Sequence, residues 1–219
     1  MDLNFHQFIP SLPFLLQGIT VTLKIVFIAG ILGFVLGIIL SVLKISKLPL
    51  LSWIADVYTS IFRGTPLVLQ LMLIYYGTPQ ITGIEIAPSV AAILSFGLNS
   101  AAYISEIIRA GILAVDKGQN EAAMALGVSK KQAMFDLILP QALKNIFPAL
   151  INEAVSLTKE SAIVTVIGVT DIMRRAYIMG GEQYSYLEPL ILAGIIYYIL
   201  VMLLTMLAKV LERRMRRSD

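Results

Sequence analysis

Long, unbroken apolar runs constrain this chain more than any other feature of its sequence. A helix needs roughly 20 mostly apolar residues to cross the hydrocarbon core of a bilayer, and we expect such spans at about residues 14–43, 51–76, 88–114, 147–169 and 187–211. Only helices and closed barrels pair every backbone polar group inside lipid. Because the apolar residues do not alternate with polar ones, a barrel is excluded.

The composition supports a protein surrounded by membrane lipid. Of the 219 residues, 58% are hydrophobic and 14% are charged, whereas soluble domains carry about 25% charge. We therefore predict an all-α membrane protein of about five transmembrane helices, forming one domain over residues 1–219. Residues 3–8 are predicted to lie at the membrane interface, and the absence of cysteine excludes disulfides.

Basic residues indicate the orientation, because short cytoplasmic loops are enriched in lysine and arginine. They gather after the first span, after the third span and in the tail: Lys44, Lys47, Lys117, Lys130, Lys131, Lys144, Arg213, Arg214, Arg216 and Arg217. The opposite side carries Arg174 and Arg175. We therefore expect the N-terminus outside and the C-terminus in the cytoplasm. Since these residues form no single patch with aromatics, they do not indicate a nucleic-acid partner.

Residues 116–141 form the one long polar segment between predicted spans. Asn120 is predicted to cap a helix that begins at Glu121, whose charge suits the positive end of the helix dipole. Gly127 is placed to end that helix, and Ser129 to cap a second helix that Pro140 limits. Two short helices outside the membrane follow from this pattern, and an ordinary helical connector remains possible at this point.

This segment resembles the cytoplasmic signature of permease subunits in ATP-binding-cassette importers. The family pattern is Glu-Ala-Ala, three residues, Gly, nine residues, Ile, any residue, Leu-Pro. The chain matches it at Glu121, Ala122, Ala123, Gly127, Leu139 and Pro140, with Leu137 in place of Ile. Residues 62–66, 110–112 and 117–119 also resemble the polar amino acid importers of this family, and the similarity covers nearly the whole chain. Permeases for arginine, lysine, histidine or glutamine look most similar.

The resemblance implies a division of labour. The permease forms the path across a prokaryotic cell membrane by alternating access, and its loop at about 116–141 supplies a coupling helix to a separate ATPase. That ATPase holds ATP and Mg, an external binding protein delivers the amino acid, and a second permease copy completes the path. A homodimer is favoured, with a heterodimer left open. The chain carries no phosphate loop of its own, so we expect no catalytic residue, no bound cofactor and no metal.

Polar residues recur on one face of three predicted spans. The sets are Asp56, Ser60, Arg63 and Gln70; Ser95, Asn99, Glu106 and Arg109; and Asn152, Glu153, Ser156 and Lys159. Polar groups in a membrane usually face a cavity or a partner, so the three faces predict a shared interior. For Asp56 and Arg63, structural pairing or a place at an interface is favoured over a role in a site. For Glu106 and Arg109, three residues apart, an ion pair is favoured.

Glu153 has no basic residue one turn further along its predicted helix, because Leu157 occupies that position. A carboxylate in the path would suit the side chain of arginine, lysine or histidine. We therefore predict a substrate site with Glu153 as its anion, Asn99 and Asn152 as hydrogen-bonding neighbours, and Asn99 or the backbone near Thr65 for the α-carboxylate. The structural alternative is a carboxylate paired with a lysine or arginine elsewhere in the chain.

Two further points stay open in the sequence. Gly33 and Gly37 have the spacing that allows two helices to approach closely, within one chain or between two. Lys24 is interpreted as a residue that extends its amino group to the membrane surface. The main rival function is an ion-gradient-driven secondary amino acid transporter, but the internal repeats expected of many such transporters are not seen here. The sequence shows neither the metal or nucleophile constellation expected of a membrane enzyme nor the filter loop expected of a channel.

Overall fold

The computed structural model describes residues 3–46 and 48–216, so Lys47 and Arg217, counted above among the basic residues, lie outside the described part. The described residues form helices and no strand. In chain order the elements are η1 (Phe5–Ser11), α1 (Leu12–Ile45), α2 (Pro49–Gly64), α3 (Leu67–Met72), η2 (Leu73–Gly77), α4 (Thr78–Thr82), α5 (Pro88–Leu113), α6 (Lys117–Ala125), α7 (Lys130–Gln132), η3 (Ala133–Ile138), α8 (Leu139–Glu160), η4 (Ser161–Ile167), α9 (Ile172–Gln183) and α10 (Leu187–Arg216).

Among the described residues, four helical stretches are long and apolar enough to cross a membrane: Phe5–Ile45, Pro88–Leu113, Lys130–Ile167 and Leu187–Val210. A bent pair, α2 with α3 to α4, makes a fifth if it counts as one span. The predicted all-α membrane fold is confirmed. The fourth span differs in its bounds: it begins well before residue 147, because the helical path from Lys130 runs on into α8.

The predicted second span is not one straight helix. α2 and the segment Leu67–Thr82 meet at an angle of 105°. Thr65 between them is extended, with φ −122° and ψ 149°, because a proline disfavours helical geometry in the residue before it and Pro66 follows. The second segment also passes Gly77 and Pro79, where the helix was expected to end, and reaches Thr82 through the π-helix η2 and α4.

α1 packs along α5 through two glycines. A Cβ on Gly33 would lie 2.9 Å from Cβ of Ser100, and a Cβ on Gly37 would lie 2.7 Å from Cγ2 of Ile104. Real side chains cannot approach that closely, so these positions need glycine for the contact. The Gly-x-x-x-Gly spacing therefore serves packing within this chain, and α5 lies against α1, α2, α3 and α8 as the central helix of the fold.

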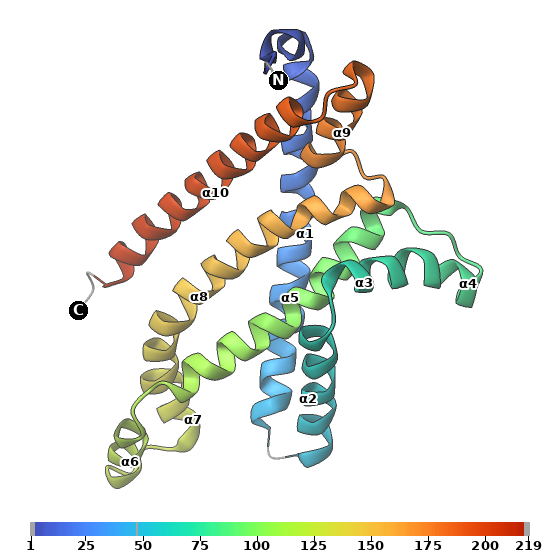
Figure 1. Ribbon diagram of the computed structural model, residues 1–219. Coiled ribbons are helices and arrows are strands. Elements are labelled where there is room, and N and C mark those ends of the chain that lie inside the picture. Colours follow the sequence, from blue (N-terminus) through green and yellow to red (C-terminus); the bar gives the residue numbers. More distant parts are fainter. Residues whose placement is uncertain (1–2, 47, 217–219) are drawn as a thin grey trace.

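The segment between α5 and α8 forms a small knob of short helices (Figure 1). Its first helix begins at Lys117, because the side chain of Asp116 accepts from the backbone N–H of Gly118; the expected cap at Asn120 was wrong. Gly127 ends the helix in the left-handed conformation, with φ +75°. Ser129 caps α7 in a capping box with Gln132, as predicted.

Pro140 does not end the helix that follows the knob. It is the second residue of α8, which continues the helical path from Lys130 without a break, so the proline, which has no N–H to donate, is accommodated inside a continuous helix. The π-helix η3 (Ala133–Ile138) leads into that position. The knob lies at the end of the molecule opposite the N-terminus, as Figure 1 shows.

α9 lies against the N-terminal part of α1 at the other end of the molecule. A Cβ on Gly18 would lie 2.6 Å from the backbone nitrogen of Ile172. Asp171 caps α9 by accepting from the backbone N–H of Arg174 at 2.8 Å, and its carboxylate also accepts from the hydroxyl of Tyr197 on α10 at 2.9 Å. These contacts fix α1, α9 and α10 to one another.

Candidate functional site

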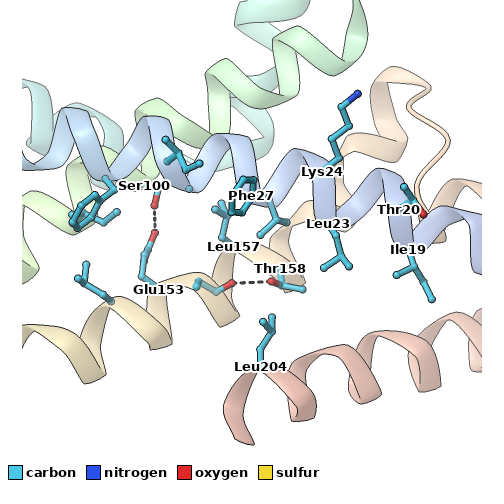
Figure 2. Close-up of a pocket in the computed structure, with 17 residues that line it drawn as sticks. Ile19, Thr20, Leu23, Lys24, Phe27, Ser100, Glu153, Leu157, Thr158 and Leu204 are labelled. Atoms are coloured by element: carbon cyan, nitrogen blue, oxygen red, sulfur yellow. Dashed lines mark hydrogen bonds between the residues drawn. The ribbon is translucent and has the colours of Figure 1, made fainter. Parts of the chain in front are cut away.

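A groove of about 940 Å³ lies between α1, α5 and α8, with Leu204 of α10 at its edge (Figure 2). Most of its lining is aliphatic or aromatic, as from Leu23, Phe27 and Leu157. Its polar lining residues are Thr20, Lys24, Ser100, Glu153 and Thr158. A mostly apolar concavity with a few polar groups is the usual form of a small-molecule site, so this groove is the candidate site.

Glu153 provides the negative charge of this groove. Its Oε1 accepts a hydrogen bond of 2.7 Å from the hydroxyl of Ser100, which joins α8 to α5. Within the described ranges, no ion pair connects Glu153 with a lysine or arginine, so the structural alternative of a paired carboxylate is not observed. A half-buried carboxylate with a single neutral donor retains acceptor capacity for a further donor.

Lys24 lines the groove from α1, but Figure 2 shows its amino group directed away from Glu153. Its side chain is exposed, which agrees with a lysine that extends along apolar surface. Thr158 donates to the carbonyl of Ala154 at 2.8 Å and is therefore satisfied within its own helix. Glu153 is thus the groove residue whose charge is directed at the space between the helices.

Asn99 and Thr65, predicted to share the site with Glu153, lie in a different cluster. Asn99 precedes Ser100 on α5, and successive side chains on a helix point about 100° apart. The amide of Asn99 donates to the carbonyl of Phe62 and to Oε1 of Gln70, both at 3.0 Å. Asn152 is exposed on α8. The structure therefore does not bring the four predicted substrate residues together, and Glu153 alone lines the groove.

From the sequence, Gln70 was placed on a polar helix face but was given no role. Its Nε2 donates to the carbonyl of Phe62 and to Oγ1 of Thr65, each at 2.8 Å. The last carbonyls of α2 have no partner within their helix, and water cannot replace that partner inside a bilayer. Gln70 and Asn99 supply the donors, which stabilises the sharp bend between α2 and α3.

A second polar cluster joins α1, α2 and α5 through charged groups. Glu106 accepts from Arg109 at 2.8 Å, which confirms the predicted ion pair, and also pairs with Lys44. Asp56 and Arg63 both take part in structural ion pairs, though not with each other. Asp56 pairs with Lys44 at 3.2 Å and Arg63 lies 3.8 Å from Glu106, because each finds an opposite charge on a neighbouring helix.

The knob presents its signature residues to the surroundings. Glu121 and Ala122 are exposed, whereas Ala123 is buried against the rest of the loop. Two apolar side chains that the sequence analysis missed are also exposed, Leu126 at 83% and Met124 at 51%. Both side chains project from the knob, and apolar residues at these two positions of an otherwise polar segment were the signal in the sequence that could have identified them.

Comparison with known proteins agrees with this geometry. The family described as binding-protein-dependent transport system inner membrane component matches residues 33–217. The arginine transport system permease protein ArtQ of Bacillus subtilis is 59% identical over 219 residues, covering 100% of both chains. The putative glutamine transport system permease protein GlnP of Rickettsia felis is 52% identical over 209 residues, covering 95% of this chain and 96% of that protein.

Solved structures show the same arrangement of helices. A chain from the crystal structure of an amino acid ABC transporter with histidines superposes with a TM-score of 0.94 at 42% identity, covering 98% of this chain and 100% of that chain. An inward-facing MetNI methionine ABC transporter chain gives a TM-score of 0.77 at 24% identity, covering 94% of this chain and 98% of that chain, which shows a shared fold.

Proposed function

Because this chain belongs to the family of binding-protein-dependent transport system inner membrane components, we propose that it is the membrane-spanning subunit of an ATP-driven importer of polar, cationic amino acids. The observation that carries the proposal is the exposed knob between α5 and α8, with Glu121, Ala122 and Gly127 in the signature positions. The arginine permease among the relatives supports a cationic substrate, and the putative glutamine permease supports the wider class of polar amino acids.

The knob is proposed to act as the coupling helix. Ala122, which is exposed, keeps that face of α6 thin, so that the helix can lie close to the surface of an ATPase, whereas the buried Ala123 lets α6 pack within the knob. Gly127 fixes the direction in which the chain leaves α6, and Leu139 with Pro140 begins α8. Movement of the ATPase would displace the knob and thereby tilt α5 and α8, between which Glu153 and Ser100 lie. This tilt would open the path alternately to either side.

Glu153 is the proposed contact for the cationic end of the substrate. It is half-buried and keeps a free acceptor in a groove large enough for an amino acid. Asn99 and Thr65 support the site from a distance, because their hydrogen bonds hold the bend between α2 and α3. The α-carboxylate would take its donors from a second permease copy or from backbone groups exposed as the helices move.

The partners of the chain follow from the same proposal. An ATPase that holds ATP and Mg binds the knob on the cytoplasmic side, where Glu121 is exposed. An external binding protein delivers the amino acid at the opposite end, near η1 and α9. A second permease copy, in a homodimer, closes the path that one set of helices leaves open.

The proposal is tested by ATP hydrolysis in proteoliposomes that contain this chain, its ATPase and its binding protein. Arginine-loaded binding protein should accelerate hydrolysis relative to the empty binding protein, and assemblies in which residues 121–127 are replaced by a Gly-Ser linker should lose that acceleration. Hydrolysis that does not respond to the loaded binding protein, together with arginine uptake driven by an ion gradient alone, would establish a secondary transporter instead.

A further inference from the structure

Lys44 is an unusual lysine for the end of a membrane-spanning helix. It lies in the last turn of α1, which ends at Ile45, where a lysine ordinarily extends its amino group to water. Here the side chain is 4% exposed. Its amino group instead donates to Oγ1 of Thr59 at 2.7 Å and pairs with Asp56 and Glu106.

The two carboxylates that bind Lys44 differ in what they connect. Asp56 is on α2, the next helix after α1, and its side chain is 61% exposed. Glu106 is on α5, and its side chain is 19% exposed. Loss of one partner from a buried ion pair strongly destabilises the folded protein, whereas an exposed ion pair contributes little to stability. The contact with Glu106 therefore dominates, and it fixes α1 to α5.

Glu106 forms ion pairs with basic residues from all three helices of this cluster. Besides Lys44 of α1, it binds Arg109 of α5 through both Nε at 3.2 Å and Nη2 at 2.8 Å. Arg63, at the end of α2, lies 3.8 Å from the same carboxylate, and its guanidinium stacks 5.5 Å from the ring centre of Tyr103 on α5. One carboxylate on α5 thus holds α1 and α2 in a fixed position relative to α5.

The position of this cluster along α5 gives it a role beyond stability. α5 ends at Leu113, and the chain then enters the knob at α6. The knob is joined to α5 at one end and to α8 at the other, and Glu106 adds charged contacts that carry a displacement of α5 to the end of α1 and to α2. On the basis of the proposed function, we infer that Lys44 and Glu106 are positioning residues, which transmit the movement of the coupling knob from α5 to the α1–α2 pair.

The test measures the number of ATP molecules hydrolysed per arginine imported by the reconstituted permease, ATPase and binding protein. Lys44→Met keeps the length of the side chain but frees α1 from Glu106. The ratio should rise several-fold, because hydrolysis continues while less of the movement reaches α1. Asp56→Asn is the matched control, because it removes a contact of the same lysine without releasing α5, and its ratio should equal that of the unmodified assembly.

Rescue separates transmission from simple stability. Lys44→Arg retains the cation and should restore the ratio, while thermal unfolding in detergent reports the stability of each variant. If the Lys44→Met assembly cannot be purified, Glu106→Gln, which keeps the shape of that side chain but removes its charge, should raise the ratio in the same way. An unchanged ratio in these variants would overturn the inference while leaving the proposed function intact. Failure of the unmodified assembly to import arginine with ATP would overturn the proposed function itself.

Discussion

The hydroxyl of Ser100 lies 2.7 Å from Oε1 of Glu153 and joins α5 to α8 inside the groove. This pair allows charge and hydrogen bonding to be tested separately. Glu153→Gln retains an acceptor for Ser100 but loses the negative charge. A charge-assisted hydrogen bond contributes about 1.5–3 kcal/mol, so the efficiency of arginine uptake should fall roughly 10- to 100-fold, whereas uptake of neutral glutamine should change little.

Ser100→Ala is the control for that variant, since it removes the hydroxyl and keeps the charge of Glu153. Its uptake should fall slightly, and to the same extent for both amino acids. Competition between radiolabelled arginine and glutamine in proteoliposomes measures both variants. Equal losses for arginine and glutamine in Glu153→Gln would remove the proposed role of Glu153 in selectivity.

Gln70→Leu should destabilise the bend between α2 and α3. The substitution leaves Oγ1 of Thr65 and the amide of Asn99 each without one partner. A buried polar group without its partner costs about 1–3 kcal/mol, so thermal unfolding in detergent should shift to lower temperature. Gln80→Leu on α4, where the side chain is exposed, is the matched control and should unfold like the unmodified protein. Identical unfolding of the two variants would show that Gln70 does not hold the bend.

Gly127→Pro should leave membrane insertion intact but separate ATP hydrolysis from uptake. Gly127 has φ +75°, whereas the φ of proline is restricted to about −65°. The N–H of Gly127 also donates to the carbonyl of Met124 at 3.1 Å, and proline has no N–H to replace it. Gly83→Pro is the matched control in another loop, because Gly83 has a similar φ of +71° and, like Gly127, open space around it. Hydrolysis per imported arginine should rise only in Gly127→Pro, and normal uptake by that variant would contradict the coupling role.

Gly18→Ala should destabilise the contact between α1 and α9. Its Cβ would lie 2.6 Å from a backbone atom of Ile172, which cannot move aside as a flexible side chain would. Such overpacking typically costs about 1–3 kcal/mol. Gly194→Ala on α10 meets no atom within 4 Å and serves as the control. Gly18→Ala should unfold at a lower temperature than Gly194→Ala. Equal unfolding temperatures would show that α1 and α9 adjust freely.

The spans could be predicted from the sequence because their apolar runs are long and lipid imposes helices. The break in the second span was missed even though Pro66 marks it, since the apolar residues continue on both sides. The knob was recognised from Glu121 and Gly127, but Asp116 took the place of Asn120 as the cap. Several residues of this loop can cap a helix, and local composition does not choose among them.

The separation of Asn99 and Thr65 from Glu153 could not be predicted from the sequence. Asn99 and Ser100 are neighbours in sequence, yet they contribute to clusters on different faces of α5. The rotation of α5 decides which of them meets Glu153, and that rotation is set by its contact with Gly33 and Gly37 on α1. The pairing of Lys44 with Glu106 likewise depends on contacts between distant segments, which a single sequence does not reveal.

Uptake of radiolabelled arginine into proteoliposomes distinguishes an ATP-driven importer from a secondary transporter. The vesicles contain this chain, its ATPase and its arginine-loaded binding protein, with glutamine as competitor. We expect uptake that requires ATP and resists competition by glutamine. Arginine uptake that proceeds without ATP on an ion gradient would contradict the ATP-driven importer.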